Sequence, residues 1–319
     1  MKLSLVGDIG GTNARIAQWR DDQLHDIEVM PTKDYPSLEA AIQHYLAKRD
    51  ITPGSIGSVC LALAGPVGGD EFKFTNNHWH ISRKAFCAAL QIDELIMVND
   101  FTAMALGMTR LAPDELVQVC DGEPEEARPR VVIGPGTGLG VGTLLCLGEG
   151  RWLALPGEGG HVDLPVGDQR EAQIWEQLQR EVGHVSAESV LSGAGLVRLY
   201  HASCTVDGNK AKYDSPADIT TAALEGDAVA AAVLDQFCCW LGRVAGNNVL
   251  TVGGRGGVYI AGGVIPRITD FFLKSGFVRS FTDKGCMTDY FKGVPVWLVT
   301  AEYPGLNGAG VALKQASKG

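Results

Sequence analysis

The sequence predicts an α/β protein of two domains, and three observations support this. The chain has 319 residues, enough for two separate hydrophobic cores. Strand-like and helix-like segments alternate through its first third, the order typical of α/β proteins. Two glycine-rich turns, at residues 7–12 and 134–138, lie about 125 residues apart, each between strand-like segments. Two turns of one kind in separate parts of the chain indicate a ligand held between two halves.

Both glycine turns are predicted to close β-hairpins that bind phosphate. The segments that follow them, residues 13–19 and 141–147, have the composition of returning strands. Dinucleotide-binding and P-loop motifs continue into a helix instead, and neither pattern fits here. Glycine lets the backbone turn tightly, and successive N–H groups in such a turn form a nest for phosphate oxygens. An ordinary hairpin turn is the alternative, but the duplication, Asp8 and the threonines in the turns favour phosphate.

The remaining elements of the first half follow from hydrophobic spacing and punctuation by proline and glycine. Expected in order are a helix over 36–49, a strand over 57–63, a helix over 82–90, a strand over 94–98 and a helix over 102–110. A polar stretch over 121–130 separates this half from the second hairpin.

The second half is predicted to be mostly helical. Asp168 and Glu171 form a capping-box pattern for a helix that ends at Gly183. Further helices are expected to begin within 184–189, at 215–216 and at 266, with strands over 258–263 and 294–300 and a last helix over 305–315. Residues 227–250 are apolar on most faces and predict a buried central helix.

Composition narrows the class of partner to a small molecule. The chain is 45% hydrophobic and carries a net charge of −10, which disfavours nucleic acid and anionic membrane. The uncharged segment 131–148 contains six glycines and a proline, so it would make a poor membrane helix. Asp8 interrupts the first apolar run too early for a signal peptide, and we expect a cytoplasmic protein. The eight cysteines contain no C-x-x-C pair and are expected to be small core residues in a reducing compartment.

Polar side chains that could do chemistry occur at three places. Asn99 and Asp100 follow a predicted strand, and ligands of α/β sheets bind at the carboxyl ends of strands. The alternative is that the Asp caps the helix that follows. Glu158 and His161 lie three apart on glycine-rich backbone that would present both to one ligand, although an ordinary loop histidine remains possible. A metal site would need a third ligand.

Glu188 completes this set, unless it only complements the dipole of a helix that begins within 184–189. The five side chains together offer many hydrogen-bond acceptors, one amide and one imidazole, with little positive charge. Such a set suits a neutral ligand that carries many hydroxyl groups. A sugar fits this description.

The chain resembles the bacterial glucokinases of the proteobacterial type, in the actin-like ATPase superfamily that includes the hexokinases. The motifs that carry the resemblance, in order, are LVGDIGGTNAR, LALAGPV, TNNHW, VNDFTA, GPGTGLGVG, LPGEGGHVDL, GHVSAESVLSG and VYIAGGVIPR. It runs essentially end to end. It implies a two-domain actin-like ATPase (ribonuclease H-like) fold, with a cleft between a small α/β domain, residues 1–110 plus 301–319, and a large one, residues 111–300.

The resemblance also implies roles for individual residues. Asp100 would be the general base, and Asn99, Asp100, Glu158, His161 and Glu188 would bind the glucose hydroxyls. The ATP-binding positions would be Gly7, Asp8, Ile9, Gly10, Gly11, Thr12, Gly136, Thr137, Gly138, Gly262 and Gly263, the last two beside the adenosine. Asp8 would lie near Mg²⁺. The related repressor and kinase family carries a cysteine-rich zinc motif after its histidine, and the chain lacks it, so no structural zinc is expected.

The expected activity is transfer of the γ-phosphoryl group of ATP to the 6-hydroxyl of glucose. A kinase of mannose, glucosamine or fructose is the alternative within enzymes. A sugar-sensing transcriptional regulator would need a DNA-binding module, and the first strand is expected to begin at Lys2. A non-catalytic sugar-binding protein would leave Asp100 and two phosphate turns without a use. The family suggests a homodimer.

Overall fold

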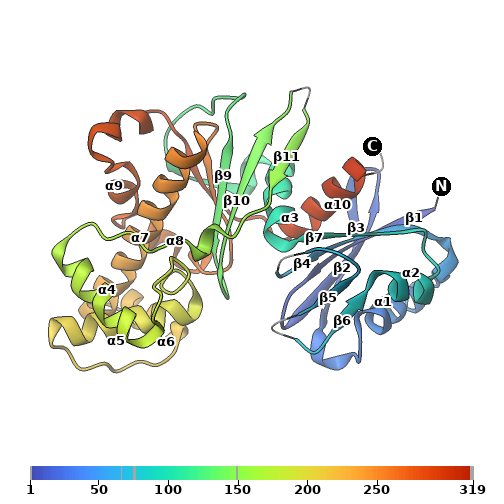
Figure 1. Ribbon diagram of the computed structural model, residues 1–319, viewed down its shortest axis with the longest axis horizontal. Helices are drawn as coiled ribbons and strands as arrows, with labels where there is room; N and C mark the ends of the chain where they lie inside the picture. The colour runs from blue at the N-terminus through green and yellow to red at the C-terminus, as the bar shows by residue number, and fades with distance from the viewer. Residues whose placement is uncertain (1, 66, 75–76, 149, 317–319) are drawn as a thin grey trace. The chain divides into compact units, whose positions relative to one another are not determined.

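The chain forms two compact units, each with its own sheet (Figure 1). The computed structural model describes residues 2–65, 67–74, 77–148 and 150–316. The first unit comprises residues up to Ala112, Trp152–Pro156 and the chain from Ala301 onward, and the second comprises Pro113–Arg151 and Gly157–Thr300. The sequence predicts that residues 152–156 belong to the larger domain. They pack with the first unit, where the Trp152 carbonyl accepts a hydrogen bond of 2.7 Å from Gln315 Nε2.

The first unit is built on a five-stranded sheet in the order β3-β2-β1-β4-β7. Its strands are β1 (Leu3–Ile9), β2 (Asn13–Arg20), β3 (Gln23–Pro31), β4 (Ile56–Leu63) and β7 (Glu94–Asn99). β2 runs antiparallel to β1 and β3, which confirms the first predicted hairpin, whereas β1, β4 and β7 are parallel. The register pairs Ile9 with Leu63 and Leu63 with Asn99. Three parallel strands therefore end at one edge of the sheet.

Four helices accompany this sheet: α1 (Leu38–Ala47), α2 (Arg83–Leu90), α3 (Asp100–Gly107) and α10 (Pro304–Ala316). Serines begin the first two, because Ser37 and Ser82 accept hydrogen bonds from Ala40 N and Ala85 N. Figure 1 shows α3 and α10 side by side, although they come from opposite ends of the chain. Glycines permit this approach, since a β-carbon at Gly308 would collide with the Ala103 carbonyl.

Smaller elements complete the first unit. They are β5 (Glu71–Lys73), β6 (His80–Ser82), β11 (Trp152–Leu155), η1 (Thr32–Asp34), η2 (Pro53–Ser55) and η3 (Met108–Arg110). The core beneath the sheet is apolar and fully buried, with Leu5, Ile42, Tyr45 and Phe86 among its members. Burial of these apolar side chains stabilises the sheet that carries the functional groups.

The five strands of the sheet in the second unit follow the order β10-β9-β12-β13-β8. They are β8 (Leu116–Cys120), β9 (Arg130–Pro135), β10 (Leu139–Cys146), β12 (Val258–Ile260) and β13 (Val296–Val299). β9 and β10 are antiparallel, which confirms the second predicted hairpin. β12 runs parallel to both β9 and β13.

Helices make up most of the rest of this unit. They are α4 (Gln169–Val182), α5 (Gly193–Asp207), α6 (Pro216–Leu224), α7 (Ala228–Val252), α8 (Thr269–Phe272) and α9 (Phe277–Thr282), with short 3-10 turns η4 (Pro113–Glu115), η5 (Gly159–His161), η6 (Ile265–Ile268) and η7 (Gly285–Phe291). The predicted central helix is confirmed: α7 contributes Leu234, Phe237 and Trp240, all fully buried, to the core. Among the described residues α7 alone is long and apolar enough to cross a membrane, and 61% of its most apolar window is buried inside the protein.

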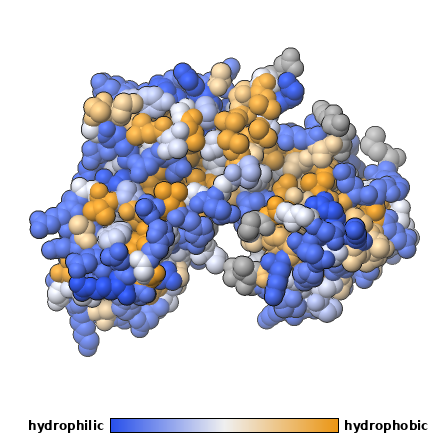
Figure 2. Space-filling model, viewed as in Figure 1, coloured by the Kyte–Doolittle hydropathy of each residue, from blue (hydrophilic) through white to orange (hydrophobic). Residues whose placement is uncertain are grey.

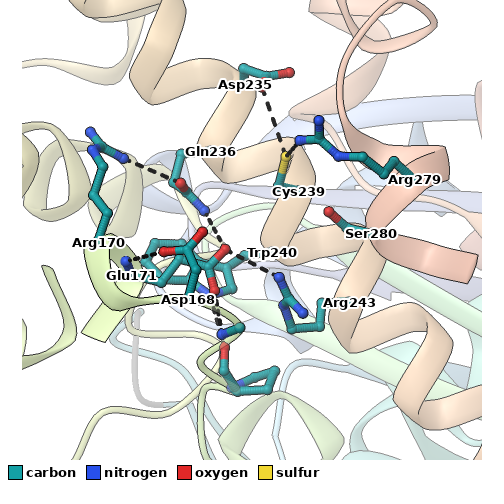
Figure 3. Close-up of polar contacts among 12 residues, drawn as sticks. Asp168, Arg170, Glu171, Asp235, Gln236, Cys239, Trp240, Arg243, Arg279 and Ser280 are labelled. Carbon is teal, nitrogen blue, oxygen red and sulfur yellow. Dashed lines mark hydrogen bonds and ion pairs between the residues drawn. The ribbon is translucent and has the colours of Figure 1, made fainter. Parts of the chain in front are cut away.

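A buried carboxylate ties α4 and the segment before it to α7 (Figure 3). Glu171 is only 3% exposed. Its Oε2 accepts from Gly167 N at 2.6 Å, and its Oε1 accepts from Gln236 Nε2 at 2.9 Å and Arg243 at 3.3 Å. Asp168 caps α4 as predicted, by accepting from Glu171 N at 2.8 Å, but the Glu171 side chain returns to Gly167 N instead of to the N–H of Asp168.

One predicted helix is wrong. Residues 184–189 form a turn, and α5 begins at Gly193. Ser186 and Ser189 bond to each other at 3.1 Å, and Ser189 Oγ also accepts from Ser186 N, so these hydroxyl groups close a turn. Ser192 is the residue that caps the helix, by accepting from Gly195 N at 3.0 Å.

Four of the eight cysteines are buried as expected of core residues, three are partly buried, and one is exposed. Cys60, Cys204, Cys238 and Cys239 are buried, and Cys286 is exposed. Burial raises the pKa of the Cys60 thiol to about 12, so this group stays protonated at neutral pH. The face seen in Figure 2 is hydrophilic over much of its area, with separate hydrophobic areas between.

Candidate functional site

Asn99 stands where β7 ends and α3 begins. Its Oδ1 accepts from Phe101 N at 2.9 Å and from Thr102 N at 3.0 Å, so the amide caps the helix. Its Nδ2 donates to the Gly65 carbonyl at 3.1 Å. The helix cap is therefore supplied by Asn99 and not by Asp100, the alternative that the sequence leaves open. These bonds fix the direction in which residue 100 leaves the sheet.

Asp100 is the first residue of α3 and is half-buried. Its Oδ1 accepts from its neighbour Phe101 N at 2.9 Å and from Asn99 Nδ2 at 3.1 Å. Negative charge is favourable at this end of a helix. A carboxylate held this way, at the carboxyl end of a parallel strand, is suited to accept a proton from a bound hydroxyl group.

Asp8 lies one residue before the end of β1, on the same edge of the sheet. Arg15 on β2 lies 3.4 Å from its Oδ2. Burial raises the pKa of Asp8, and the Arg15 guanidinium partly opposes that shift. The Gly305 backbone at the start of α10 also lies beside this carboxylate, since a β-carbon there would come within 3.3 Å of Asp8 Oδ2.

The first glycine turn is held to its own unit through its carbonyl oxygens. Thr32 Oγ1 donates to the Gly11 carbonyl at 2.9 Å and to the Thr12 carbonyl at 3.2 Å. Asn77 Nδ2 donates to the Gly10 carbonyl at 3.2 Å. These bonds fix the conformation of a turn that lies beside Asp8.

The second glycine turn packs against two other loops of its unit. The Gly136 carbonyl accepts from Gly193 N, the first residue of α5, at 2.9 Å. Gly262 has a φ of 85°, and Val264 N donates to the Pro135 carbonyl at 3.2 Å. The structure therefore brings the predicted phosphate turn 136–138 and the predicted adenosine turn 262–263 together.

Of the three residues that were predicted to bind sugar from this unit, two face each other. His161 Nε2 lies 4.0 Å from Glu188 Oε1, and the Glu188 side chain is 33% exposed. Glu188 Oε2 accepts from Leu139 N at 2.8 Å. Glu158 is exposed and belongs to the same short turn as His161, whose N–H donates to the Glu158 carbonyl at 3.0 Å. In place of the expected loop, Glu158 directly precedes the 3-10 turn η5 and His161 is its last residue.

Mg²⁺ is the metal ion that fits the side chains of this site. Within the described residues, no group of three or more histidine, cysteine or acidic side chains could hold an ion by itself. Mg²⁺ is commonly bound by one or two carboxylates together with waters and substrate phosphates. Asp8, a carboxylate beside a turn suited to phosphate, fits that pattern.

Three groups that shape this site cannot be recognised from the sequence motifs. Arg15 and Asn77 lie inside motifs that were recognised, yet nothing in the motif shows that their side chains turn back toward Asp8 and Gly10. The backbone N–H of Leu139 is invisible in a sequence because every residue but proline has one. Pro66 of the LALAGPV motif and residues 75–76 of the TNNHW motif lie outside the described residues.

Comparison with known proteins gives concordant results. The sequence model of the glucokinase family matches residues 5–316. A glucokinase of Pseudomonas paraeruginosa is 56% identical over 315 residues, which is 98% of this chain and 93% of that protein. The crystal structure of a glucokinase from an Antarctic psychrotroph has a TM-score of 0.88 at 37% identity, covering 99% of both chains. That of a Balamuthia mandrillaris glucokinase in complex with glucose has a TM-score of 0.81 at 22% identity, covering 98% of this chain and 94% of that one.

Proposed function

This chain belongs to the glucokinase family, and we propose that it transfers the γ-phosphoryl group of ATP to the 6-hydroxyl of glucose with Asp100 as general base. Its fold is the two-domain actin-like ATPase fold that its motifs predict. The observation that carries the assignment of roles is the strand register of the first unit. Ile9, Leu63 and Asn99 lie in one row, so the Asp8 turn and Asp100 share one sheet edge.

Asp100 would orient the 6-hydroxyl and accept its proton as the new bond to phosphorus forms. Asn99 supports this in two ways, because its amide caps the helix that carries Asp100 and donates to Asp100 Oδ1. Phosphoryl transfer passes through a loose transition state, so positioning and charge neutralisation contribute more than proton removal. The base is still expected to be worth roughly 10²–10⁴ in rate.

Glucose recognition would combine both units. Asn99 and Asp100 from the first unit and Glu158, His161 and Glu188 from the second would bind hydroxyl groups of one sugar. Carboxylates accept from hydroxyl groups, while an amide or imidazole can also donate, so together they can satisfy a ring of neighbouring hydroxyls. The 4.0 Å between His161 and Glu188 supports their action on adjacent groups.

The ATP phosphates would be bound by backbone N–H groups of residues 7–12 and 136–138, and the adenosine would lie beside Gly262 and Gly263. Mg²⁺ bound near Asp8 would neutralise charge on the phosphates. The contact between the 262–264 turn and Pro135 supports a single nucleotide site in the second unit for the adenosine and one phosphate turn. We further propose a cytoplasmic homodimer, on the resemblance to the family.

A kinase specific for mannose, glucosamine or fructose would use the same machinery and is the alternative to be tested. Initial rates of ADP release with each hexose, and with galactose, decide the question. Glucose should give the highest kcat/KM. Galactose, its 4-epimer, should be worse by about 10³ or more, because sites built to hydrogen-bond a hydroxyl discriminate strongly when it is displaced. A higher kcat/KM for another hexose would reassign the substrate, and comparable values for galactose would remove these residues from sugar recognition.

A further inference from the structure

The space beside Gly138 is filled by a side chain rather than by open solvent. A β-carbon built on Gly138 would collide with Oε2 of Glu188 and lie 3.1 Å from its Cδ. That same Oε2 accepts the hydrogen bond of 2.8 Å from Leu139 N, the next residue along the chain. The carboxylate thus sits directly on the backbone of the second glycine turn.

The other glycine of this turn is in a different position. A β-carbon on Gly136 would meet nothing closer than the Gly138 carbonyl oxygen, at 3.9 Å. Neither residue has a φ in the left-handed region, so alanine is compatible with the backbone at both. Glycine is therefore required at 138 by what occupies the space beside it and not by the shape of the turn.

From this difference we infer that Gly138 is a positioning residue for the sugar carboxylate Glu188. The inference rests on the proposed function, in which Glu188 binds glucose. The backbone of residue 138 can still contribute to phosphate binding. Its lack of a side chain lets the Glu188 carboxylate reach Leu139 N and face His161 from a fixed position. One turn then serves the sugar through residue 138 and the nucleotide through residue 136.

The atom that an alanine would displace is the end of a flexible side chain. The carboxylate can rotate away, so Gly138→Ala should fold, with a melting temperature lower by only a few degrees. It should lose the contact between Glu188 Oε2 and Leu139 N, a hydrogen bond to a charged group. We expect the KM for glucose to rise about tenfold to a hundredfold, with the KM for ATP within about twofold of the wild-type value.

Gly136→Ala is the matched control. It places the same methyl group in the same turn, away from Glu188. Its KM for glucose should stay within about twofold of the wild-type value. Any change that this variant causes should be in the KM for ATP. Titration of glucose in the absence of nucleotide should give the same order of affinities, with Gly138→Ala the weaker binder.

A double-mutant cycle with Glu188→Asp identifies the residue through which position 138 acts. Aspartate is one methylene shorter and withdraws the carboxylate from Gly138. In that background Gly138→Ala should add less than about twofold to the KM for glucose. If Gly138→Ala alone failed to fold, the double variant should fold.

Three results would overturn the inference. The first is that Gly138→Ala raises the KM for ATP but not the KM for glucose, and the second is that both alanine variants raise the KM for glucose equally. The third is that Gly138→Ala raises the KM for glucose by the same factor in the Glu188→Asp background as in the wild type. Failure of both the single and the double variant to fold would do the same. Failure of the proposed function appears separately, in a wild-type protein that releases no ADP with glucose.

Discussion

The two units hold their functional groups in different ways. In the first unit Asp8, Asn99 and Asp100 stand at the ends of parallel strands that register aligns in one row. In the second unit Glu188 and His161 stand on turns, and these turns are held by contacts between backbones, such as Glu188 N to the Gly160 carbonyl at 2.8 Å. One arrangement depends on a sheet, the other on loops that pack against loops.

Because of this difference, substitutions in the two units should affect stability differently. A side chain at a strand end can be changed while the sheet beneath it remains. A glycine between two packed turns cannot gain a β-carbon unless a neighbouring atom moves. The cost in stability depends on whether that atom belongs to a flexible side chain or to the backbone. At Gly138 the partner is a flexible carboxylate, whereas at Gly160 it is the Leu139 carbonyl of the backbone.

Gly160→Ala should therefore be the most damaging change to folding. Its β-carbon would overlap the Leu139 carbonyl oxygen, which belongs to β10 and cannot rotate away. Overpacking of this kind typically costs about 1–3 kcal/mol. Urea denaturation measures it, with Gly157→Ala as the control, since a β-carbon there meets nothing within 4 Å. Equal stability of the two variants would contradict the collision with the Leu139 carbonyl.

Asn99→Ala tests the strand-end side of the comparison. The variant loses the cap of α3, which should lower the free energy of unfolding by about 0.5–2 kcal/mol, and it loses the support of Asp100. Asn99→Ser keeps an oxygen that can accept from the first N–H groups of the helix, and it avoids the second carboxylate that aspartate would place beside Asp100. Thermal unfolding should place the serine variant nearer the wild type, and the opposite order would contradict the capping role.

Asp8→Asn should have the smallest effect on stability, and its sign depends on pH. Because burial raises the pKa of Asp8 in the folded protein, the free energy of unfolding falls as pH rises from the unfolded pKa, about 3.9, through that raised value. The variant lacks this titration. Compared with wild type, it should gain stability between about pH 3 and pH 7, while its kcat with Mg²⁺ and ATP falls. Urea denaturation at both pH values gives the difference, and a relative loss toward pH 7 would contradict the burial of Asp8.

The sequence predicted best where a short pattern determines a local structure. Both hairpins, the buried helix α7 and the strand that ends at Asn99 follow from alternation, apolar spacing and glycine. The helix expected within 184–189 failed because Ser186 and Ser189 bond to each other, and a hydroxyl group suits a turn as well as a cap. Contacts such as Glu188 with Leu139 N join residues 49 positions apart, and no local pattern reports them.

Asp100 is proposed to remove the proton from the hydroxyl group that attacks ATP. Asp100→Asn tests this proposal most directly, because the amide oxygen can keep the bonds from Phe101 N and Asn99 Nδ2 while its basicity is lost. Glucose titration and turnover should be measured on one preparation. We expect a glucose affinity within about threefold of the wild type and a kcat lower by about 10²–10⁴. A variant that keeps more than about a third of wild-type kcat would contradict the proposal, since loss of a general base cannot cost so little.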